Sequence, residues 1–338
     1  MNPSRLESLK NWVGQCLSQT LETWEVASLD ASYRRYYRTN AKGVSYIVMD
    51  APPQHENASL WLEVACELRE GGVRVPEVWQ VNLEQGFVLL SDFGSETLLA
   101  RLQQESLASL DRRFWYRRAL LVLLQVQSVS AQQRPLYDGV LLKRELDIYL
   151  EWYVKVHRQK ILSVSEQELW DKTCDLLIQR HLNEHRVYVH RDFHSRNLMI
   201  LEKELGVLDF QDAVFGPLSY DVVSLLRDAY IELGEEEQLD LLAFYWEQAR
   251  AKGIAVPVDF GQFYQDFEWM GVQRHIKILG VFARLCWRDH KPQYLAAESL
   301  LVRSLWKTCE RYRELRPLGR WVLLMSGLDI GIVEGMTF

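Results

Sequence analysis

The sequence has few of the residues that mark secreted, membrane or nucleic-acid-binding proteins. Its five cysteines are scattered, and none stands in a C-x-x-C pair or at metal-ligand spacing from a histidine. This pattern argues against a disulfide framework and predicts unpaired thiols in a reducing compartment. The net charge of −7 lacks the basic surplus typical of nucleic-acid binders. A local basic pocket for a phosphate stays compatible with that charge.

Long apolar runs are also missing. No stretch of 18 apolar residues occurs, so no membrane-spanning helix is predicted. Residues 1–17 carry charges throughout, which argues against a signal peptide. The segment 321–338 is apolar, but Asp329, Glu334 and several glycines interrupt it, so we expect a packed tail. We therefore expect a soluble cytoplasmic protein without a nucleic-acid or membrane partner, and the sequence does not indicate its oligomeric state.

The first third of the chain differs in pattern from the rest. Helical spacing of apolar residues predicts helices at 4–20 and 58–70. Short aromatic or β-branched runs predict strands at 24–28, 33–39, 44–50, 78–82 and 86–90. After residue 94 helical spacing dominates, with expected helices at 96–104, 109–128, 143–161, 165–184, 218–232, 236–252, 260–282 and 293–314. Three short strands are expected among them, at 187–189, 198–201 and 206–208.

These elements predict an α+β fold with two lobes. We expect a small lobe with an antiparallel sheet and a helix at 1–93, ending in a hinge. A larger, mainly helical lobe is expected at 94–338. No flexible linker separates them in composition.

A polar segment lies between two apolar runs at residues 187–200, VYVHRDFHSRNLMI. It contains H-R-D-x-x-x-x-N, the kinase catalytic loop, in which the aspartate is the base and the asparagine binds magnesium. Asp209 follows 12 residues after Asn197, in VLDFQD. Amide and carboxylate oxygens suit Mg²⁺. The pattern predicts phosphoryl transfer from Mg-ATP, with Asp192 as base and Asn197 and Asp209 as metal ligands. A merely solvated polar turn is the alternative, which the flanking strands disfavour.

Around this segment the sequence resembles the aminoglycoside phosphotransferase and choline kinase superfamily. HRDFHSRNLMI is followed by GVLDFQDAVFGPLSYDVVSLLRD, with Gly-Pro and Tyr-Asp after the metal aspartate. The DFG and APE motifs of protein kinases are absent. Longer stretches are similar to the anomeric N-acetylmuramate/N-acetylglucosamine kinases (the AmgK type), over about residues 5–320. They are DASYRRYYR, YIVMDAPP, RELDIYLEWYV and RHIKILGVFARLCWRDHKPQYL.

The resemblance implies a bilobal protein-kinase-like fold, with the nucleotide in the first lobe and the acceptor in the second. It implies an ATP-dependent kinase that phosphorylates the C1 hydroxyl of these sugars in bacterial cell-wall (peptidoglycan) recycling. It gives Asp192, Asn197 and Asp209 the roles stated above. It also places Leu90 and Asp92 in the hinge, where backbone groups would meet adenine.

Two departures from the kinase pattern concern the phosphates of ATP. The expected phosphate-covering loop lacks a Gly-x-Gly pattern and offers Ser32, Arg34 and Arg35 instead. An arginine can clamp phosphate oxygens, although both arginines are equally interpretable as solvated strand-edge residues. The phosphate-binding lysine of the third strand is replaced by Met49. Either a loop arginine substitutes, with Glu63 as a candidate to orient it, or the nucleotide is held differently.

The acceptor pocket has no comparable motif. The candidate substrate-binding residues are Glu145, Arg227, Arg274 and Trp287, each of which is alternatively a helix-surface or packing residue. Several basic residues on the expected acceptor side weakly favour a neutral or anionic acceptor: Arg227, Arg274, Lys277, Arg284 and Arg288.

Two alternative functions stay open. In the first, the enzyme is a kinase of another small alcohol, such as an aminoglycoside, choline or another sugar. In the second, it is a pseudokinase, for which Met49 is the one argument. Finally, Asp212 and Asp221 are expected to be structural, with Asp212 as an additional metal-site carboxylate in a minority interpretation.

Overall fold

The computed structural model describes residues 3–28, 33–104 and 108–329. The chain divides into two compact units. Unit 1 comprises Met1–Ala100 and Arg196–Asp212, and unit 2 comprises Arg101–Ser195 and Ala213–Phe338. The expected division into a nucleotide-binding lobe (1–93) and an acceptor lobe (94–338) stays a prediction. The compact units differ from them mainly because the segment that carries Asn197 and Asp209 belongs to unit 1.

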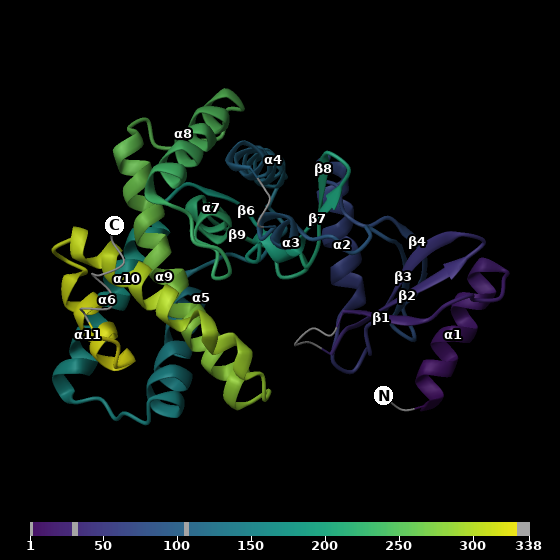
Figure 1. Ribbon diagram of the computed structural model, residues 1–338, viewed down its shortest axis with the longest axis horizontal. Coiled ribbons are helices and arrows are strands. Elements are labelled where there is room, and N and C mark those ends of the chain that lie inside the picture. The colour runs from purple at the N-terminus through teal and green to yellow at the C-terminus, as the bar shows by residue number, and fades with distance from the viewer. Residues whose placement is uncertain (1–2, 29–32, 105–107, 330–338) are drawn as a thin grey trace. The chain divides into compact units, whose positions relative to one another are not determined.

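Unit 1 contains a five-stranded antiparallel sheet in the order β1-β2-β3-β5-β4 (Figure 1). Its strands are β1 (Glu25–Ser28), β2 (Arg35–Ala41), β3 (Val44–Asp50), β4 (Val78–Asn82) and β5 (Phe87–Ser91). Helix α1 (Pro3–Leu17) packs Leu9 and Val13 against one face, where Val48 and Leu89 lie. Successive strand residues face opposite sides, so Met49 faces away from α1, and it is fully buried.

Helix α2 (Ala58–Glu70) follows β3 and has signals at both ends. The Asn57 side chain accepts a hydrogen bond from the Leu60 amide, 3.1 Å long, and so caps the first turn. Gly72 adopts a left-handed conformation with φ +80°, which glycine tolerates without strain. Trp61, on the buried face of α2, contacts the ring of Phe210 with 5.0 Å between centroids.

The chain returns to unit 1 as the hairpin of β7 (Leu198–Leu201) and β8 (Glu204–Val207). The Ile200 amide donates to the Glu96 carbonyl, 2.9 Å away, and the Val207 amide donates to the Arg74 carbonyl, 2.8 Å away. These bonds fix the segment that follows the catalytic loop to the first unit.

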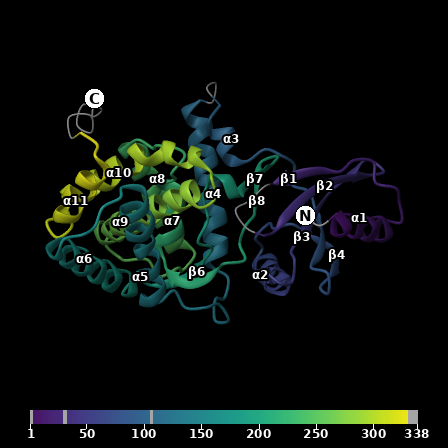
Figure 2. The ribbon, with the colours of Figure 1, turned by 90° about the horizontal axis from the view of Figure 1, so that it is seen from below.

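Unit 2 is mainly helical (Figure 2). Its elements, with α3 at the boundary, are α3 (Leu98–Leu102), α4 (Ser109–Gln127), α5 (Gly139–Ile148), the π-helical segment η1 (Tyr149–His157), α6 (Val164–Leu182), β6 (Arg186–Val189), β9 (Val214–Pro217), α7 (Ser219–Leu226), α8 (Glu235–Ala251), α9 (Phe260–Trp287), η3 (Pro292–Ala297), α10 (Glu298–Arg311) and α11 (Arg316–Ser326). Helix α9 packs against α5, α7 and α10, and its buried face contributes Trp269, Val272 and Ile276 to the core.

The α+β architecture agrees with the prediction, and the differences are local. Strand β9 and helix α11 were not expected, and the strand predicted at 206–208 lies at Glu204–Val207. The helix predicted at 218–232 ends at Leu226 because Arg227 leaves helical geometry, with φ −122° and ψ 45°. Among the described residues, no helix is long and apolar enough to cross a membrane.

Candidate active site

The predicted catalytic loop follows β6 in unit 2, and a buried aspartate fixes its backbone. Asp221, in the first turn of α7, accepts hydrogen bonds from the His190 amide (2.6 Å) and the Arg191 amide (3.1 Å). Arg191 has φ +76°, a conformation that side chains other than glycine seldom adopt. Strained residues persist only where the surroundings hold them. Asp221 therefore positions the loop, as expected from the sequence.

Asp192 lies among cations of unit 2. Removal from water raises the pKa of its carboxyl, but Lys277, His194 and Arg274 lower it, to about 2. Arg274 is 4% exposed and donates a 3.0 Å hydrogen bond to the Arg191 carbonyl. Asp192 is therefore a carboxylate at neutral pH and can accept hydrogen bonds.

The carboxylate of Glu145 lies behind this loop at 3% exposure. It accepts a 2.6 Å hydrogen bond from Arg191 Nη2 and lies 2.9 Å from Lys277 Nζ. The Tyr137 hydroxyl also donates to it. Lys277 in turn donates to the Tyr220 hydroxyl, 2.7 Å away. These contacts engage the Glu145 carboxylate with Arg191 and Lys277. Its geometry therefore favours a role in holding these two cations beside Asp192, and disfavours the predicted contact with substrate.

The four predicted acceptor residues are thus not brought together. Glu145 and Arg274 lie at the catalytic loop and support it. Trp287 is 48% exposed, and its indole donates to His157 Nδ1, 3.1 Å away. Arg227 belongs to a separate buried network. The structure adds Lys277 to the residues around Asp192. The sequence had indicated it only as one of several basic residues. No local motif marks it, because its partners come from α5 and α7.

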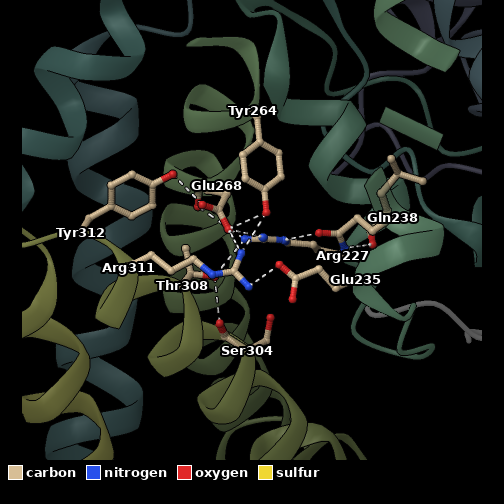
Figure 3. A network of polar contacts seen from close by, with 10 residues as sticks. Arg227, Glu235, Gln238, Tyr264, Glu268, Ser304, Thr308, Arg311 and Tyr312 are labelled. Carbon is tan, nitrogen blue, oxygen red and sulfur yellow. Dashed lines mark hydrogen bonds and ion pairs between the residues drawn. The ribbon is translucent and has the colours of Figure 1, made fainter. Parts of the chain in front are cut away.

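The network around Arg227 lies between α7, α9 and α10 (Figure 3). Its guanidinium lies 3.2 Å from Glu268 Oε1 and 3.1 Å from the Thr308 hydroxyl. The fully buried Glu268 also accepts from Arg311, 2.6 Å away, and from the Tyr312 hydroxyl, 2.5 Å away. Arg227 therefore ties helices together.

The predicted metal ligands, Asn197 and Asp209, lie in unit 1. Asn197 ends the short helical turn η2 (Ser195–Asn197), and its carbonyl accepts from the Leu208 amide at 2.9 Å. Asp209 has φ +61°, and its side chain is 41% exposed. Gln211 donates to Asp209 Oδ1, 2.9 Å away. An exposed carboxylate and an amide on adjoining backbone fit Mg²⁺, which completes its shell with water and phosphate oxygens.

The residues predicted to bind nucleotide have different surroundings. Arg34 is an ion-pair partner of both Glu56 and Asp209, at 3.7 and 3.8 Å. Arg35 is exposed at the first position of β2. Ser32 lies outside the described residues. Met49, fully buried in β3, does not offer a phosphate contact.

The predicted hinge residues Leu90 and Asp92 are held within unit 1. Leu90 is 2% exposed and pairs with Ile47 in the sheet. Asp92 accepts from Arg38 (2.6 Å) and Ser45 (2.5 Å), and although burial raises its pKa, these hydrogen bonds lower it. The Asp92 side chain therefore holds the segment after β5 through Arg38 and Ser45.

Comparisons with known proteins identify relatives over almost the whole chain. Residues 23–254 match the model of the phosphotransferase enzyme family. An N-acetylmuramate/N-acetylglucosamine kinase of Neisseria meningitidis serogroup B is 41% identical over 332 residues, which cover 98% of both chains. A protein of the same name from Pseudomonas aeruginosa is 40% identical, covering 97% of this chain and 98% of the relative.

Solved structures show the same fold at low sequence identity. An ADP-bound aminoglycoside phosphotransferase is 14% identical with a TM-score of 0.60, covering 90% of this chain and 98% of that one. The choline kinase LicA from Streptococcus pneumoniae is 13% identical with a TM-score of 0.62, covering 88% and 98%. These likenesses confirm the predicted kinase-like fold class.

Proposed function

The chain belongs to the phosphotransferase enzyme family, and from this premise we propose that it is an ATP-dependent kinase of the anomeric hydroxyl of N-acetylmuramate and N-acetylglucosamine. Relatives named for these two sugars, 36–41% identical over nearly the full length, support the choice of acceptor. The observation that carries the chemistry is the ionised Asp192 on a loop that Asp221 fixes. Such a kinase would return amino sugars of the cell wall to metabolism.

Asp192 acts on the acceptor. Its carboxylate accepts a hydrogen bond from the C1 hydroxyl and points the oxygen at the γ-phosphorus of ATP. As the bond between this oxygen and phosphorus forms, the bond from phosphorus to the β,γ-bridging oxygen breaks, and ADP leaves with the electron pair. The hydroxyl proton passes to Asp192. With a pKa of about 2, Asp192 is a weak base. That suffices because a loose phosphoryl-transfer transition state needs positioning more than proton abstraction.

Asn197 and Asp209 are the residues that would hold magnesium. Magnesium bound with ATP neutralises charge on the phosphate oxygens. The two side chains supply hard oxygen donors, and the hydrogen bond from Leu208 to Asn197 keeps their backbone segments adjacent. Leu90 and Asp92 are proposed to present backbone groups to adenine, and Ser32 and Arg35 remain proposed contacts of the nucleotide.

The charges near Asp192 do not select the acceptor. Arg191, Arg274 and Lys277 are all close enough to lower its pKa. Glu145 pairs with Arg191 and Lys277, and Asp192 is itself ionised, so these carboxylates offset most of the positive charge. The choice of the acetylated sugars as acceptors therefore rests on the relatives named for them.

The test is ADP release with Mg-ATP and four acceptors in parallel: N-acetylmuramate, N-acetylglucosamine, kanamycin and choline. We expect turnover with the two sugars, and a loss of about 10²–10⁴-fold in kcat for Asp192→Asn. The thermal unfolding of Asp192→Asn serves as the control for folding. Turnover with kanamycin or choline alone would overturn the sugar assignment, and silence with all four would favour a pseudokinase.

A further inference from the structure

The third strand of the sheet leaves the phosphates of ATP without their usual cation. Met49 stands where kinases carry a lysine, and it is fully buried. We propose that Arg34 is the phosphate-binding cation of this enzyme and that Glu56 orients it. This inference rests on the proposed function, from which ATP is taken as the nucleotide. Neither Arg34 nor Glu56 belongs to the catalytic loop.

Arg34 lies between two carboxylates of unit 1. Its Nε lies 3.7 Å from Glu56 Oε2, and its Nη2 lies 3.8 Å from Asp209 Oδ1. The Arg34 side chain is 11% exposed, so it is packed rather than extended into water. Asp209 is the proposed metal ligand. An arginine that reaches this carboxylate is within range of phosphate oxygens that would share a metal with it.

The position of Arg34 is fixed by neighbouring contacts. Tyr33 stacks on His55, with 4.2 Å between ring centroids and 17° between planes. The successive residues Tyr33 and Arg34 are thus held against the successive residues His55 and Glu56. This clasp, the residues 33–34 on 55–56, attaches the segment before β2 to the segment before α2.

Helix α2 connects the clasp to the metal side of the unit. Asn57 caps the helix directly after Glu56. One turn further, Trp61 packs against Phe210, the residue next to Asp209. The same helix therefore sets the place of Glu56 and the place of the Asp209 segment, so the guanidinium between them is positioned by the fold of unit 1.

The ion pairs of Arg34 with Glu56 and Asp209 are longer than the 2.7–3.2 Å of a normal N–H···O hydrogen bond. In the proposal, phosphate oxygens join the guanidinium on the side of Asp209, while Glu56 holds it from the other side. The planar fork of arginine binds two phosphate oxygens at once, which a lysine does not. The geometry selects Glu56 over Glu63, because Glu63 lies exposed on α2.

The experiment measures nucleotide binding by the full-length protein without any sugar. Dissociation constants for Mg-ATP and for adenosine are determined by calorimetry for the wild type, Arg34→Met, Arg34→Lys, Arg35→Met and Glu56→Gln. Arg74→Met is the matched control, because Arg74 is another arginine of unit 1 that pairs with a glutamate, at 3.1 Å, but its side chain is 61% exposed.

We expect Arg34→Met to weaken Mg-ATP binding by about 10–100-fold, in line with the loss of charged hydrogen bonds. Adenosine binding should change less than about twofold, since adenosine lacks the phosphates. Arg34→Lys should recover part of the affinity, Glu56→Gln should lose about 3–10-fold, and Arg74→Met should match the wild type. Thermal unfolding of each variant confirms that it is folded.

Three results would overturn the inference: wild-type affinity for Mg-ATP in Arg34→Met, an equal loss for adenosine and ATP, or a loss in Arg35→Met that Arg34→Met does not show. The proposed sugar kinase activity is tested separately. If ATP binding depends on Arg34 but no acceptor is phosphorylated, the function fails and the phosphate contact stands.

Discussion

Arg191 donates a 2.6 Å hydrogen bond to the buried carboxylate of Glu145, so helix α5 anchors the residue directly before the proposed base. The same carboxylate holds Lys277 at 2.9 Å. A positive-φ residue needs such support, because its backbone conformation is unfavourable by itself. The catalytic loop is thus fixed from two sides, by Asp221 through its amides and by Glu145 through the Arg191 side chain.

Replacing Glu145 should affect catalysis more than substrate binding. Glu145→Gln leaves two partly buried cations, Arg191 and Lys277, without their counter-charge, which costs up to about 3–5 kcal/mol of stability. Because Arg191 would lose its anchor, we expect kcat to fall at least about tenfold with little change in KM for either sugar. Glu145→Asp should restore part of kcat. Steady-state kinetics and thermal unfolding check both effects, with the exposed Glu151→Gln as control. A lower melting temperature with unchanged kcat would reduce Glu145 to a purely structural residue.

Removing Asp209 should weaken magnesium binding specifically. In Asp209→Asn the carboxylate charge is lost while the side-chain volume is kept, so we expect Mg²⁺ to support ATP binding only at concentrations about 10–100-fold higher. Magnesium titrations at fixed ATP, followed by nucleotide fluorescence, measure the change. The exposed Asp212 offers the comparison. If Asp212→Asn shifts the titration as far as Asp209→Asn, then the minority interpretation of Asp212 as a metal-site carboxylate is right.

Arg227 should matter for stability and not for the sugar. In Arg227→Met the buried Glu268 keeps Arg311 and two tyrosines but loses a cation 3.2 Å away (Figure 3). Because Glu268 keeps Arg311 and two tyrosine hydroxyls, we expect a decrease of about 1–3 kcal/mol in unfolding free energy, the cost of a charged hydrogen bond, and not the larger cost of a buried charge left without any partner. Urea unfolding measures this, with Arg313→Met, an exposed position, as control. A KM for sugar that rises tenfold in Arg227→Met, with stability unchanged, would restore the substrate contact predicted from the sequence.

Local signals in the sequence predicted more of the fold than of the candidate site. Helix α2 was predicted at its observed bounds from the helical spacing of its apolar residues and the Gly71-Gly72 pair that follows it, and in the structure Asn57 caps its first turn. Strand β9 was missed because VFGP contains a glycine and a proline, and its partner β6 is distant in the chain. Helix α11 was missed although Pro317 stands in its first turn, a usual start signal.

The same distinction between local and distant signals applies to the candidate site. The motif from Asp192 to Asn197 is contiguous, so it was recognisable as a unit. Glu145 was predicted as a candidate substrate-binding residue. Its observed role depends instead on Arg191 and Lys277, which lie on other elements. Likewise Glu56 had no distinguishing signal, because only the folded chain brings Arg34 to it. Contacts between side chains that are distant in the sequence do not produce a recognisable spacing in the sequence.

A buried histidine should make a destabilising contribution to the folded protein in mild acid. Burial lowers the pKa of His275 to about 3. The folded protein therefore keeps this imidazole neutral, whereas the unfolded chain protonates it below about pH 6.5. Since the unfolded state binds the extra proton between pH 6.5 and 3, the unfolding free energy decreases as pH falls through this window. The contribution between pH 7 and pH 5 amounts to about 2 kcal/mol.

A variant isolates this contribution from that of other groups. Asp221 acts in the opposite direction: burial raises its pKa to about 7, so its contribution is lost as pH rises from about 3.8 to 7. In His275→Gln the unfolding free energy at pH 7 minus that at pH 5 should be about 2 kcal/mol lower than in the wild type, because glutamine does not titrate and the opposing contribution of Asp221 is unchanged. Urea unfolding at the two pH values measures it. His185→Gln, at an exposed position, should keep the wild-type difference. An identical pH dependence in His275→Gln and the wild type would mean that His275 is not the group that destabilises the fold in acid.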